Sequence, residues 1–332
     1  MSTCTDQHTT LAFSPRSQHP PRPRLLPRRS SYGAVYHARR RADGMEVAVK
    51  IIPAEEDATE LRKEIDLMVK LSGPYVVRLY DCYYKDHEAW LVMEYCGGGS
   101  ACDVMEACGE PLSEAEAREC VAWSALALHY LHGGRKLHRD VKAGNVLLTD
   151  DGRAKLADFG VSKEVNSLVA NKAQTVIGTP YWMAPEVIQE VPYNGQADVW
   201  SLAITAIELV EGNPPLHKVH PMRAIFMIPS RPSPRLKKPE MYSPELNDFI
   251  ANCLEKKPED RPTSEQLLQH PWLKAEVEEI RSGGGEKGTA AIRDLVRRTV
   301  GQLTQFRQVG TALLHSRQYF KALQGAYSTS YF

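Results

Sequence analysis

The sequence predicts an α+β fold with two lobes: a small antiparallel β lobe that carries one helix, and a larger lobe that is mainly α-helical. Two observations lead to this fold class. Residues 33–96 follow a strand, helix, strand pattern, and beyond the stretch CGGGS (96–100) the pattern becomes helical. The chain has 332 residues, of which 42% are hydrophobic, so it is long enough to bury the core that such a fold requires.

Alternating apolar and polar residues predict the strands of the small lobe. They are expected at 34–38, 46–52, 76–84 and 89–96. The first two form a hairpin around the turn signal ADG. Between the two strand pairs, residues 55–71 are predicted to form a helix, because Leu61, Ile65 and Met68 share one face at helical spacing.

Two long amphipathic helices dominate the prediction for the large lobe. They span 113–132 and 196–212, and the first begins with a capping box formed by Ser113 and Glu116. We expect CGGGS to be a flexible break between the lobes. From 274 onward we expect a linker, EEIRSGGGEKG, followed by an amphipathic helical tail that lacks a clean heptad pattern. This tail either packs back on the body, which we favour, or forms a dimer seam.

Residues 1–30 are rich in Pro, Arg, Ser and Thr and contain one acidic residue, Asp6, so we predict that they are disordered. A transit peptide shares this composition. A floppy tail or a wrongly joined first exon explains it more simply. Lys plus Arg and Asp plus Glu both total 41, a balance that favours neither nucleic acid nor an anionic membrane as a partner.

The seven cysteines include no CxxC pair, and no apolar signal segment opens the chain. We therefore expect reduced thiols in a cytosolic or nuclear protein. No apolar run reaches the roughly 18 residues that a membrane span needs.

The stretch HRDVKAGNVLLTDDGRAKLADFG (138–160) carries the residues for phosphoryl transfer, a reaction that needs positioning and charge neutralisation more than covalent help. Asp140 can accept the proton of an attacking hydroxyl, and Lys142 can place positive charge near the migrating phosphoryl group. Asn145 and Asp158 supply the hard oxygen ligands that Mg²⁺ prefers. Each residue alone has an ordinary structural explanation, but the combined spacing H-R-D-x-K-x-x-N followed by D-F-G favours a catalytic function.

These motifs resemble those of the eukaryotic protein kinases, and the resemblance covers residues 31–273, with a small lobe at 31–96 and a large lobe at 97–273. It implies the two-lobed protein kinase fold, with ATP and Mg²⁺ as cofactors. Lys50 in VAVK resembles the strand lysine that anchors the α- and β-phosphates, and Glu64 its ion-pair partner. The resemblance gives the remaining nucleotide contacts as Gly33, Val35, Ala48, Met93, Glu94, Cys96 and Leu147.

Among the remaining nucleotide contacts, Val35 and Ala48 would lie above the adenine and Leu147 below it. Met93 would be the gatekeeper residue. The backbone of Glu94 and Cys96 would hydrogen-bond the adenine edge.

The resemblance also assigns regulatory and scaffold residues. Thr175 matches the site of activating phosphorylation, and its phosphate would pair with Arg139. Thr179 beside Lys142 is the pattern of Ser/Thr rather than Tyr kinases. Scaffold roles fall on an expected ion pair between Glu186 and Arg261, and on Asp198, which would hold the backbone of the catalytic loop.

Longer runs, among them TVIGTPYWMAPEVIQE and HPMRAIFMIP, resemble the germinal-centre branch of the sterile-twenty superfamily, closest to the Hippo-type kinases. This resemblance implies protein substrates with Ser or Thr, such as downstream kinases or adaptors, in a signalling cascade. It implies activation by another kinase or by trans-autophosphorylation in a dimer. The expected location is cytoplasmic, with nuclear shuttling.

The phosphate-binding loop departs from the G-x-G-x-x-G pattern, because Arg28 and Ser30 stand where the first two glycines belong and only Gly33 remains. A glycine-only conformation at Arg28 or Ser30 would cost on the order of 1–3 kcal/mol each. Pro27 also removes an amide donor from the expected first strand. A wrong first exon, which we favour, or a natural divergent loop explains the departure. A pseudokinase with weakened ATP binding is the alternative function.

Overall fold

The computed structural model describes residues 24–30, 33–40, 43–53, 65, 71–85, 87–158, 180–285 and 287–327, and of 24–34, 85 and 309–327 it describes only the course of the backbone. The chain divides into two compact units. The smaller unit holds the described residues of Met1–Glu56, Leu79–Tyr95 and Arg307–Phe332, and the larger unit holds those of Asp57–Arg78 and Cys96–Phe306.

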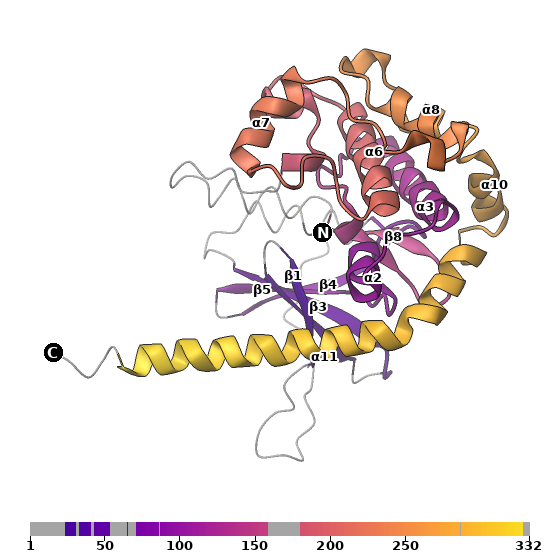
Figure 1. Ribbon diagram of the computed structural model, residues 1–332. Coiled ribbons are helices and arrows are strands. Elements are labelled where there is room, and N and C mark those ends of the chain that lie inside the picture. The colour runs from indigo at the N-terminus through magenta and orange to yellow at the C-terminus, as the bar shows by residue number, and fades with distance from the viewer. Residues whose placement is uncertain are drawn as a thin grey trace, which may run out of the picture. The chain divides into compact units, whose positions relative to one another are not determined.

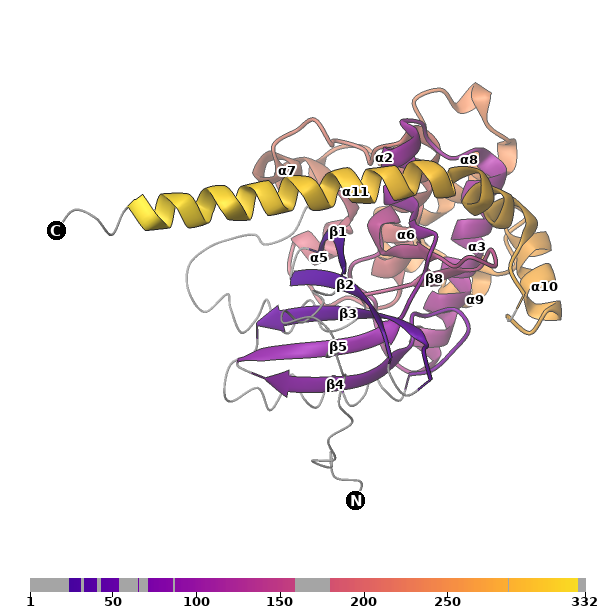
Figure 2. The ribbon, with the colours of Figure 1, turned by 90° about the horizontal axis from the view of Figure 1, so that it is seen from below.

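The smaller unit is built on a five-stranded antiparallel sheet with the strand order β1-β2-β3-β5-β4 (Figure 2). Its strands are β1 (Arg24–Ser30), β2 (Gly33–Arg39), β3 (Glu46–Pro53), β4 (Leu79–Lys85) and β5 (Glu88–Glu94). The alternating β-branched and aromatic residues of β3 and β5 place them at the centre of the sheet, where both neighbours pair. The predicted hairpin of β2 and β3 is confirmed.

The register of the sheet separates two faces. Lys50 lies opposite Val35 on β2 and Leu91 on β5, and Ala48 lies opposite Met93. Directly opposed residues share a face, as do residues two apart on one strand, so all five point to the same side. The opposite face carries the apolar core of this unit, centred on Val47, Val49 and Val92.

Strand β1 corrects the prediction that residues 1–30 are disordered, since Arg24–Ser30 pair with β2; residues 1–23 lie outside the described residues. Pro27 is accommodated because β1 is an edge strand and its register shifts between Leu26 and Arg29. An edge strand with such an irregularity needs no ladder donor at that position. Arg28 and Ser30 therefore lie in a strand, and the expected glycine-only conformation does not arise there.

The larger unit is mainly helical (Figure 1). Its first half contains β6 (Gly99–Ser100), α2 (Ala101–Cys108), α3 (Glu114–Gly133), η1 (Ala143–Asn145), β7 (Val146–Leu148), β8 (Ala154–Leu156), η2 (Pro180–Trp182) and α5 (Pro185–Ile188). Its second half contains α6 (Gln196–Glu211), α7 (Pro221–Ser230), η3 (Pro239–Met241), α8 (Pro244–Cys253), η4 (Pro258–Asp260), α9 (Ser264–Leu267) and α10 (Lys274–Ser282). It also contains α11 (Ala290–Tyr327) as far as Phe306, and the residues of this helix from Arg307 onward belong to the smaller unit. Among the described helices, none combines the length and the apolar character that a bilayer crossing requires.

Helices α3 and α6 form the centre of this unit and pack against each other. The predicted capping box begins α3: the Ser113 hydroxyl accepts from the Glu116 amide, and the Glu116 carboxylate accepts from the Ser113 amide at 2.8 Å. Small residues on α3 allow close helix packing, and nearly every residue of α6 is buried. The loops that follow these two helices are thereby held on a rigid support.

The stretch CGGGS is a packed segment, and the prediction of a flexible break there is wrong. The Gly98 amide donates to the Leu148 carbonyl at 3.0 Å. A Cβ atom on Gly98 would lie 2.8 Å from that carbonyl oxygen and 2.9 Å from Val296 Cγ2. Glycine is needed here because β7 and α11 approach the backbone closely, and not because the chain must bend freely.

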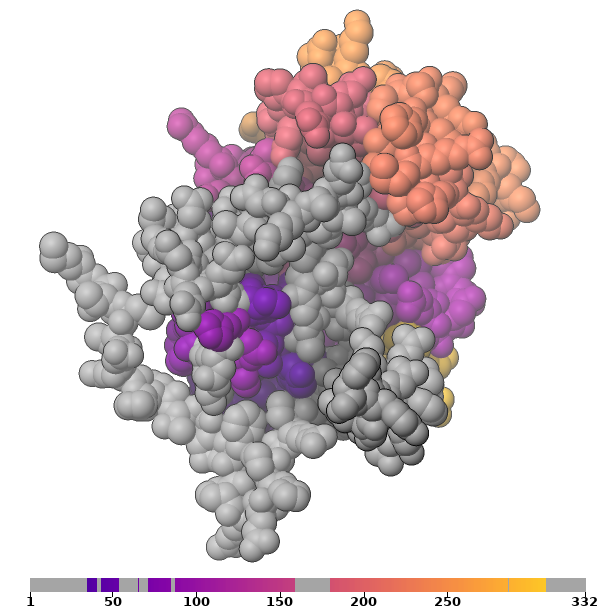
Figure 3. Space-filling view, turned by 90° about the vertical axis from the view of Figure 1, so that its left-hand side faces the viewer, coloured from indigo at the N-terminus to yellow at the C-terminus, as the bar shows by residue number. Residues whose placement is uncertain are grey.

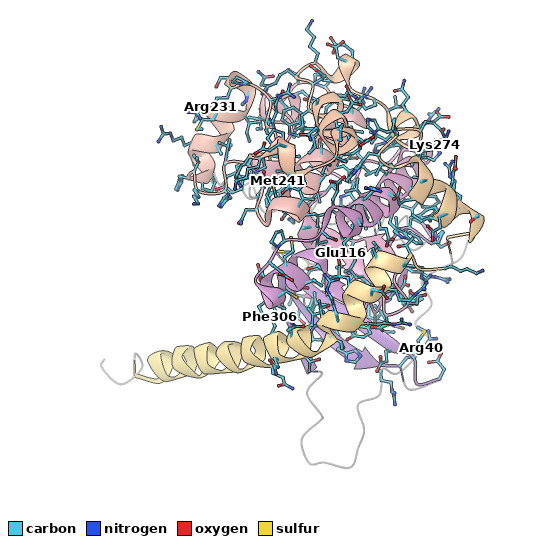
Figure 4. All side chains as sticks on the ribbon, turned by 45° about the vertical axis from the view of Figure 1, so that its right-hand side comes forward. Arg40, Glu116, Arg231, Met241, Lys274 and Phe306 are labelled. Atoms are coloured by element: carbon cyan, nitrogen blue, oxygen red, sulfur yellow. The ribbon has the colours of Figure 1, made fainter. Side chains whose placement is uncertain are left out.

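Helix α11 begins on the surface of α3. The Glu119 carboxylate accepts from the amides of Ala291 at 3.0 Å and Ile292 at 2.8 Å, which satisfies two unpaired donors of the first turn. Glu116 forms an ion pair with Arg298, and Figure 4 shows Glu116 beside the first turns of α11. With Ile292, Leu295, Val296 and Leu303 buried, the predicted packing of the tail on the body is confirmed for this part of the helix.

Candidate active site

A compact polar cluster lies in the loop between α3 and β7. Lys142 Nζ donates to both carboxylate oxygens of Asp140, at 2.9 and 2.7 Å. Asn145 Nδ2 donates to the Asp140 carbonyl at 2.7 Å and to its carboxylate at 2.9 Å. Asn145 is buried, whereas the Asp140 side chain keeps 34% of its surface exposed. The predicted residues are thus brought together, with one carboxylate held firmly and still open to a reactant.

The loop that carries Asp140 is anchored from below by Asp198 on α6. Its carboxylate accepts from the backbone amides of His138 at 2.9 Å and Arg139 at 2.8 Å. His132 Nε2 lies 2.8 Å from the same carboxylate. Arg139 has φ +70°, a left-handed conformation that a non-glycine residue adopts only when its surroundings enforce it. These hydrogen bonds supply that enforcement and fix the direction of the next residue, Asp140.

Burial and hydrogen bonding act in opposite directions on Asp198. Burial by itself would raise the pKa of its carboxyl group, but the hydrogen bond from His132, the nearby His138 and the two amides together lower the pKa of Asp198 below its ordinary value. Burial lowers the pKa of His138, so its imidazole is kept neutral. A neutral His138 can donate from Nε2 to the Ala157 carbonyl at 3.0 Å and accept the Asp140 amide at Nδ1.

The loop of Asp158 is tied to the loop of Asn145. The Ala157 amide donates to the Asn145 carbonyl at 2.9 Å, and the Ala157 carbonyl faces His138. Asp158 follows directly and has φ +63°, a second left-handed non-glycine residue in this region. Because the Asn145 amide nitrogen is engaged with Asp140, its oxygen is the atom left for a cation. One carboxylate and one amide oxygen form a hard donor set that fits Mg²⁺.

Glu208 is a residue of this site that the sequence analysis missed. It lies on α6, is buried, and accepts from the Ala143 amide at 2.9 Å and from Trp182 Nε1 at 2.8 Å. Burial raises the pKa of Glu208 to about 7, despite these hydrogen bonds and the positive charge of Lys142. The available signal was a glutamate in the otherwise apolar run ITAIELV, where an ionisable group must have a partner.

The expected ion pair between Glu186 and Arg261 is present. Arg261 donates Nη1 to Glu186 Oε1 at 2.6 Å and Nη2 to Oε2 at 2.8 Å, and both side chains are buried. The remaining Arg261 hydrogens reach the carbonyls of Glu255, Lys256 and Gln196. The segment that follows residue 179 is thereby fixed to the helical body.

The smaller unit holds a second group of predicted residues. Lys50 is only 2% exposed, and it shares its face of the sheet with Val35, Ala48 and Met93. This face therefore presents one cation among small and apolar side chains. Glu94 ends β5, whereas Cys96 and the half-buried Leu147 belong to the larger unit.

Three predicted residues, Glu64, Thr175 and Thr179, lie outside the described residues. Gly33 is described only by its backbone, which pairs with Ser30 at the end of the β1–β2 hairpin. Arg139 has an exposed side chain, and no carboxylate among the residues that the structure describes forms an ion pair with it.

A comparison with known families agrees with this arrangement. A family described as the protein kinase domain matches residues 29–273. The match covers most of the chain and includes strands β2 to β5 of the antiparallel sheet, the Asp140 cluster and the Glu186–Arg261 pair. A protein kinase domain implies phosphotransferase activity on protein substrates, with ATP and a divalent metal. The chain belongs to the protein kinase family.

Proposed function

We propose that the chain is a serine/threonine protein kinase that transfers the γ-phosphoryl group of ATP to protein hydroxyls in a signalling cascade. One observation carries the proposal. Asp140 is held by Lys142 and Asn145 in a single orientation while its carboxylate stays partly open to solvent. A purely structural aspartate has no need of a cation, an amide donor and access at once.

In the proposed reaction, Asp140 positions the attacking hydroxyl and accepts its proton as the new O–P bond forms. The bond between the γ-phosphorus and the β–γ bridging oxygen of ATP breaks, and ADP is the leaving group. Lys142 donates hydrogen bonds to the same carboxylate, and its positive charge stabilises the negative charge of the migrating phosphoryl group. The left-handed backbone at Arg139 sets the orientation of Asp140, and the hydrogen bonds to Asp198 hold this orientation, so the loop need not reorganise during the reaction. Positioning of this kind is the main contribution that protein groups make to phosphoryl transfer.

The nucleotide contacts follow from the family resemblance. Lys50 would bind the α- and β-phosphates and pair with Glu64, and Val35 and Ala48 would cover the adenine from the sheet. The gatekeeper Met93 and the backbone of Glu94 and Cys96 would define the adenine edge, with Leu147 on the opposite side. Asn145 and Asp158 would hold Mg²⁺, which neutralises phosphate charge when it is bound.

Acceptor specificity and activation rest on the resemblance together with Arg139. Thr179 together with Lys142 matches the pattern of kinases that accept a short Ser or Thr side chain. Phosphorylation of Thr175 would add about two negative charges and three acceptor oxygens. The exposed Arg139 guanidinium, which has no carboxylate partner among the described residues, supports its assignment as the group that binds this phosphate.

The Hippo-type resemblance places the protein in a cascade with downstream kinases or adaptors as substrates, and with an activating kinase or a second copy as the source of the Thr175 phosphate. We place it in the cytoplasm with access to the nucleus.

A pseudokinase that binds nucleotide weakly is the second candidate, and the observation that favours it is the pair Arg28 and Ser30 in place of two glycines. The extended backbone of β1 at these two positions limits how closely amides approach a phosphate. Thermal unfolding with and without Mg·ATP separates the candidates. A kinase predicts a rise in the midpoint that Asp158→Asn reduces. No rise in either protein, together with no phosphate in Ser or Thr after incubation with an acceptor, favours the pseudokinase.

A further inference from the structure

Helix α7 leaves an apolar face uncovered. Ala224 and Ile228 are buried and attach the helix to the larger unit. On the solvent side, Phe226 is 73% exposed and Met222, one turn before it, is 46% exposed. Side chains four apart on a helix are neighbours, so these two form one continuous apolar surface. A helix that is apolar on both sides and buried on only one indicates that a second partner covers the other.

The surroundings of this face are strongly basic. Residues 212–239 contain six Lys and Arg residues and no Asp or Glu. Five of them are exposed and form no ion pair with a carboxylate of the described residues: Lys218, Arg223, Arg231, Arg235 and Lys238. The sixth, Lys237, pairs with Glu211 at 2.7 Å. In a chain whose total charge balances, this local excess is a property of the segment and not of the composition.

Met222, Arg223 and Phe226 form, with the flanking Lys218, Arg231 and Arg235, a surface that we call the α7 patch. Figure 4 shows Arg231 at the outer end of α7, pointing away from the body of the larger unit. In Figure 3 the coral surface of the segment around α7 faces the viewer uncovered. The patch is therefore accessible to another macromolecule.

The α7 patch is connected to the catalytic loop by hydrogen bonds. The Tyr181 hydroxyl donates to the Val219 carbonyl, just before α7, at 2.5 Å. The neighbouring Trp182 donates to Glu208, which accepts from the Ala143 amide beside Lys142. A protein that rests on the patch is thus bound near Pro180–Trp182, a segment that shares the buried acceptor Glu208 with the catalytic loop. This location favours a partner whose own hydroxyl enters the active site.

We infer that the α7 patch is a docking site for protein substrates, occupied by a substrate segment that carries an aromatic or aliphatic side chain beside Asp and Glu residues. The apolar side chain would cover Phe226 and Met222, and the carboxylates would pair with Arg223 and Arg231. The inference rests on the proposed kinase function and adds to it a class of substrate. Docking outside the active site raises the local concentration of the acceptor hydroxyl and leaves the chemical step unchanged.

Kinetics with two acceptors test the inference in the full chain. Dephosphorylated α-casein serves as an acidic acceptor and myelin basic protein as a basic one. The variants are Phe226→Ser and Arg223→Glu, and the matched controls are Val300→Ser and Arg297→Glu, both on the exposed side of α11. Each patch variant is expected to raise KM for casein about tenfold with kcat unchanged, and to leave KM for myelin basic protein at or below the wild-type value. The controls are expected to change neither.

Equal effects on both acceptors, no effect of Phe226→Ser on casein, or the same effect from Val300→Ser would overturn the inference. If neither the wild type nor the variant with Arg28→Gly and Ser30→Gly phosphorylates either acceptor, the proposed kinase function fails first, and fluorescence anisotropy with labelled dephosphorylated casein then decides the docking question. Casein binding that Phe226→Ser weakens supports the docking inference, and absence of casein binding overturns it. Two further measurements test other occupants of the α7 patch. Sedimentation detects a dimer, and flotation with phosphatidylserine vesicles detects binding to a membrane. If Phe226→Ser abolishes either a dimer or vesicle binding, the docking inference is overturned.

Discussion

The carboxylate of Glu208 accepts a hydrogen bond from the backbone amide of Ala143, three residues after Asp140. The same carboxylate accepts from Trp182, in the segment that follows residue 179. Two loops that are distant in sequence are therefore joined at one buried acid. Since no charged side chain among the described residues contacts this acid directly, its protonation state and its hydrogen bonds decide how the catalytic loop is held.

Replacement of Glu208 by alanine is expected to lower kcat at least tenfold, because the Ala143 amide and Trp182 Nε1 lose their buried acceptor. Each unsatisfied buried donor costs about 1–3 kcal/mol. Steady-state kinetics and thermal unfolding measure the two effects. Glu208→Gln keeps an acceptor oxygen and should retain most of the activity. Equal loss in both variants would show that the shape of the side chain matters and the hydrogen bonds do not.

The pH dependence of stability gives a separate test of Glu208. Burial raises the pKa of this acid from 4.5 to about 7, so the folded protein keeps a proton that the unfolded chain has released. The stabilising contribution is therefore complete below pH 4.5 and is lost as the pH rises toward 7, by on the order of 3 kcal/mol. The difference in unfolding free energy between wild type and Glu208→Gln should fall over this range. A difference in unfolding free energy that stays constant with pH contradicts the raised pKa of Glu208.

The buried pair of Glu186 and Arg261 predicts a large asymmetry between single and double substitution. Arg261→Met should lower the free energy of unfolding by about 3–5 kcal/mol, because it leaves a buried carboxylate without a partner. The double variant with Glu186→Leu should recover part of that loss. Arg297→Met, which removes an exposed pair with Asp294, should change stability by less than about 1 kcal/mol. Denaturant unfolding compares the four proteins.

Helix α11 depends on Glu119 for its first turn. Glu119→Ala removes the acceptor of the Ala291 and Ile292 amides, and the expected loss is about 1–2 kcal/mol of local stability. Hydrogen exchange in residues 290–299 should become faster, while exchange in α6 stays unchanged. Glu110→Ala, an exposed acid in the same region of the sequence, serves as the control. Unchanged protection in Glu119→Ala would mean that apolar contacts alone hold the helix.

Activation is expected to require Thr175. Thr175→Ala should lower activity severely and leave the unfolding midpoint unchanged, because it removes the proposed phosphate site. If Arg139 binds the phosphate, the substitutions Arg139→Ala and Thr175→Ala remove the same interaction, so their effects on activity should not add. The double variant should then be as active as the less active of the two single variants. Thr304→Ala, on the exposed side of α11, controls for loss of a hydroxyl. Full activity in Thr175→Ala would show that activation does not require phosphorylation of Thr175.

Much of the fold followed from local patterns. The hairpin of β2 and β3, the capping box of α3 and the long buried α6 each depend on residues close in sequence, and all are present. The cluster of Asp140, Lys142 and Asn145 was predictable because eight consecutive residues, 138–145, carry the whole motif. The Glu186–Arg261 pair, distant in sequence, was expected only from the family resemblance.

The errors share a physical cause, which is tertiary contact. Arg24–Ser30 has a disordered composition, yet pairing with β2 makes it a strand. The glycines of CGGGS have a flexible composition, yet Leu148 and Val296 approach Gly98 so closely that glycine is required there. Glu208 was missed because its partners are a backbone amide and an indole, and neither leaves a charged complement in the sequence.

Transfer of radiolabelled phosphate from ATP to myelin basic protein by purified wild type and Asp140→Asn tests the central claim most directly. The account predicts incorporation into Ser and Thr by the wild type, or by a variant with Arg28→Gly and Ser30→Gly if the altered loop limits ATP binding. Asp140→Asn should lower the rate 10²- to 10⁴-fold with its unfolding midpoint preserved. Equal rates in wild type and Asp140→Asn, or no transfer by any of these proteins, would contradict it.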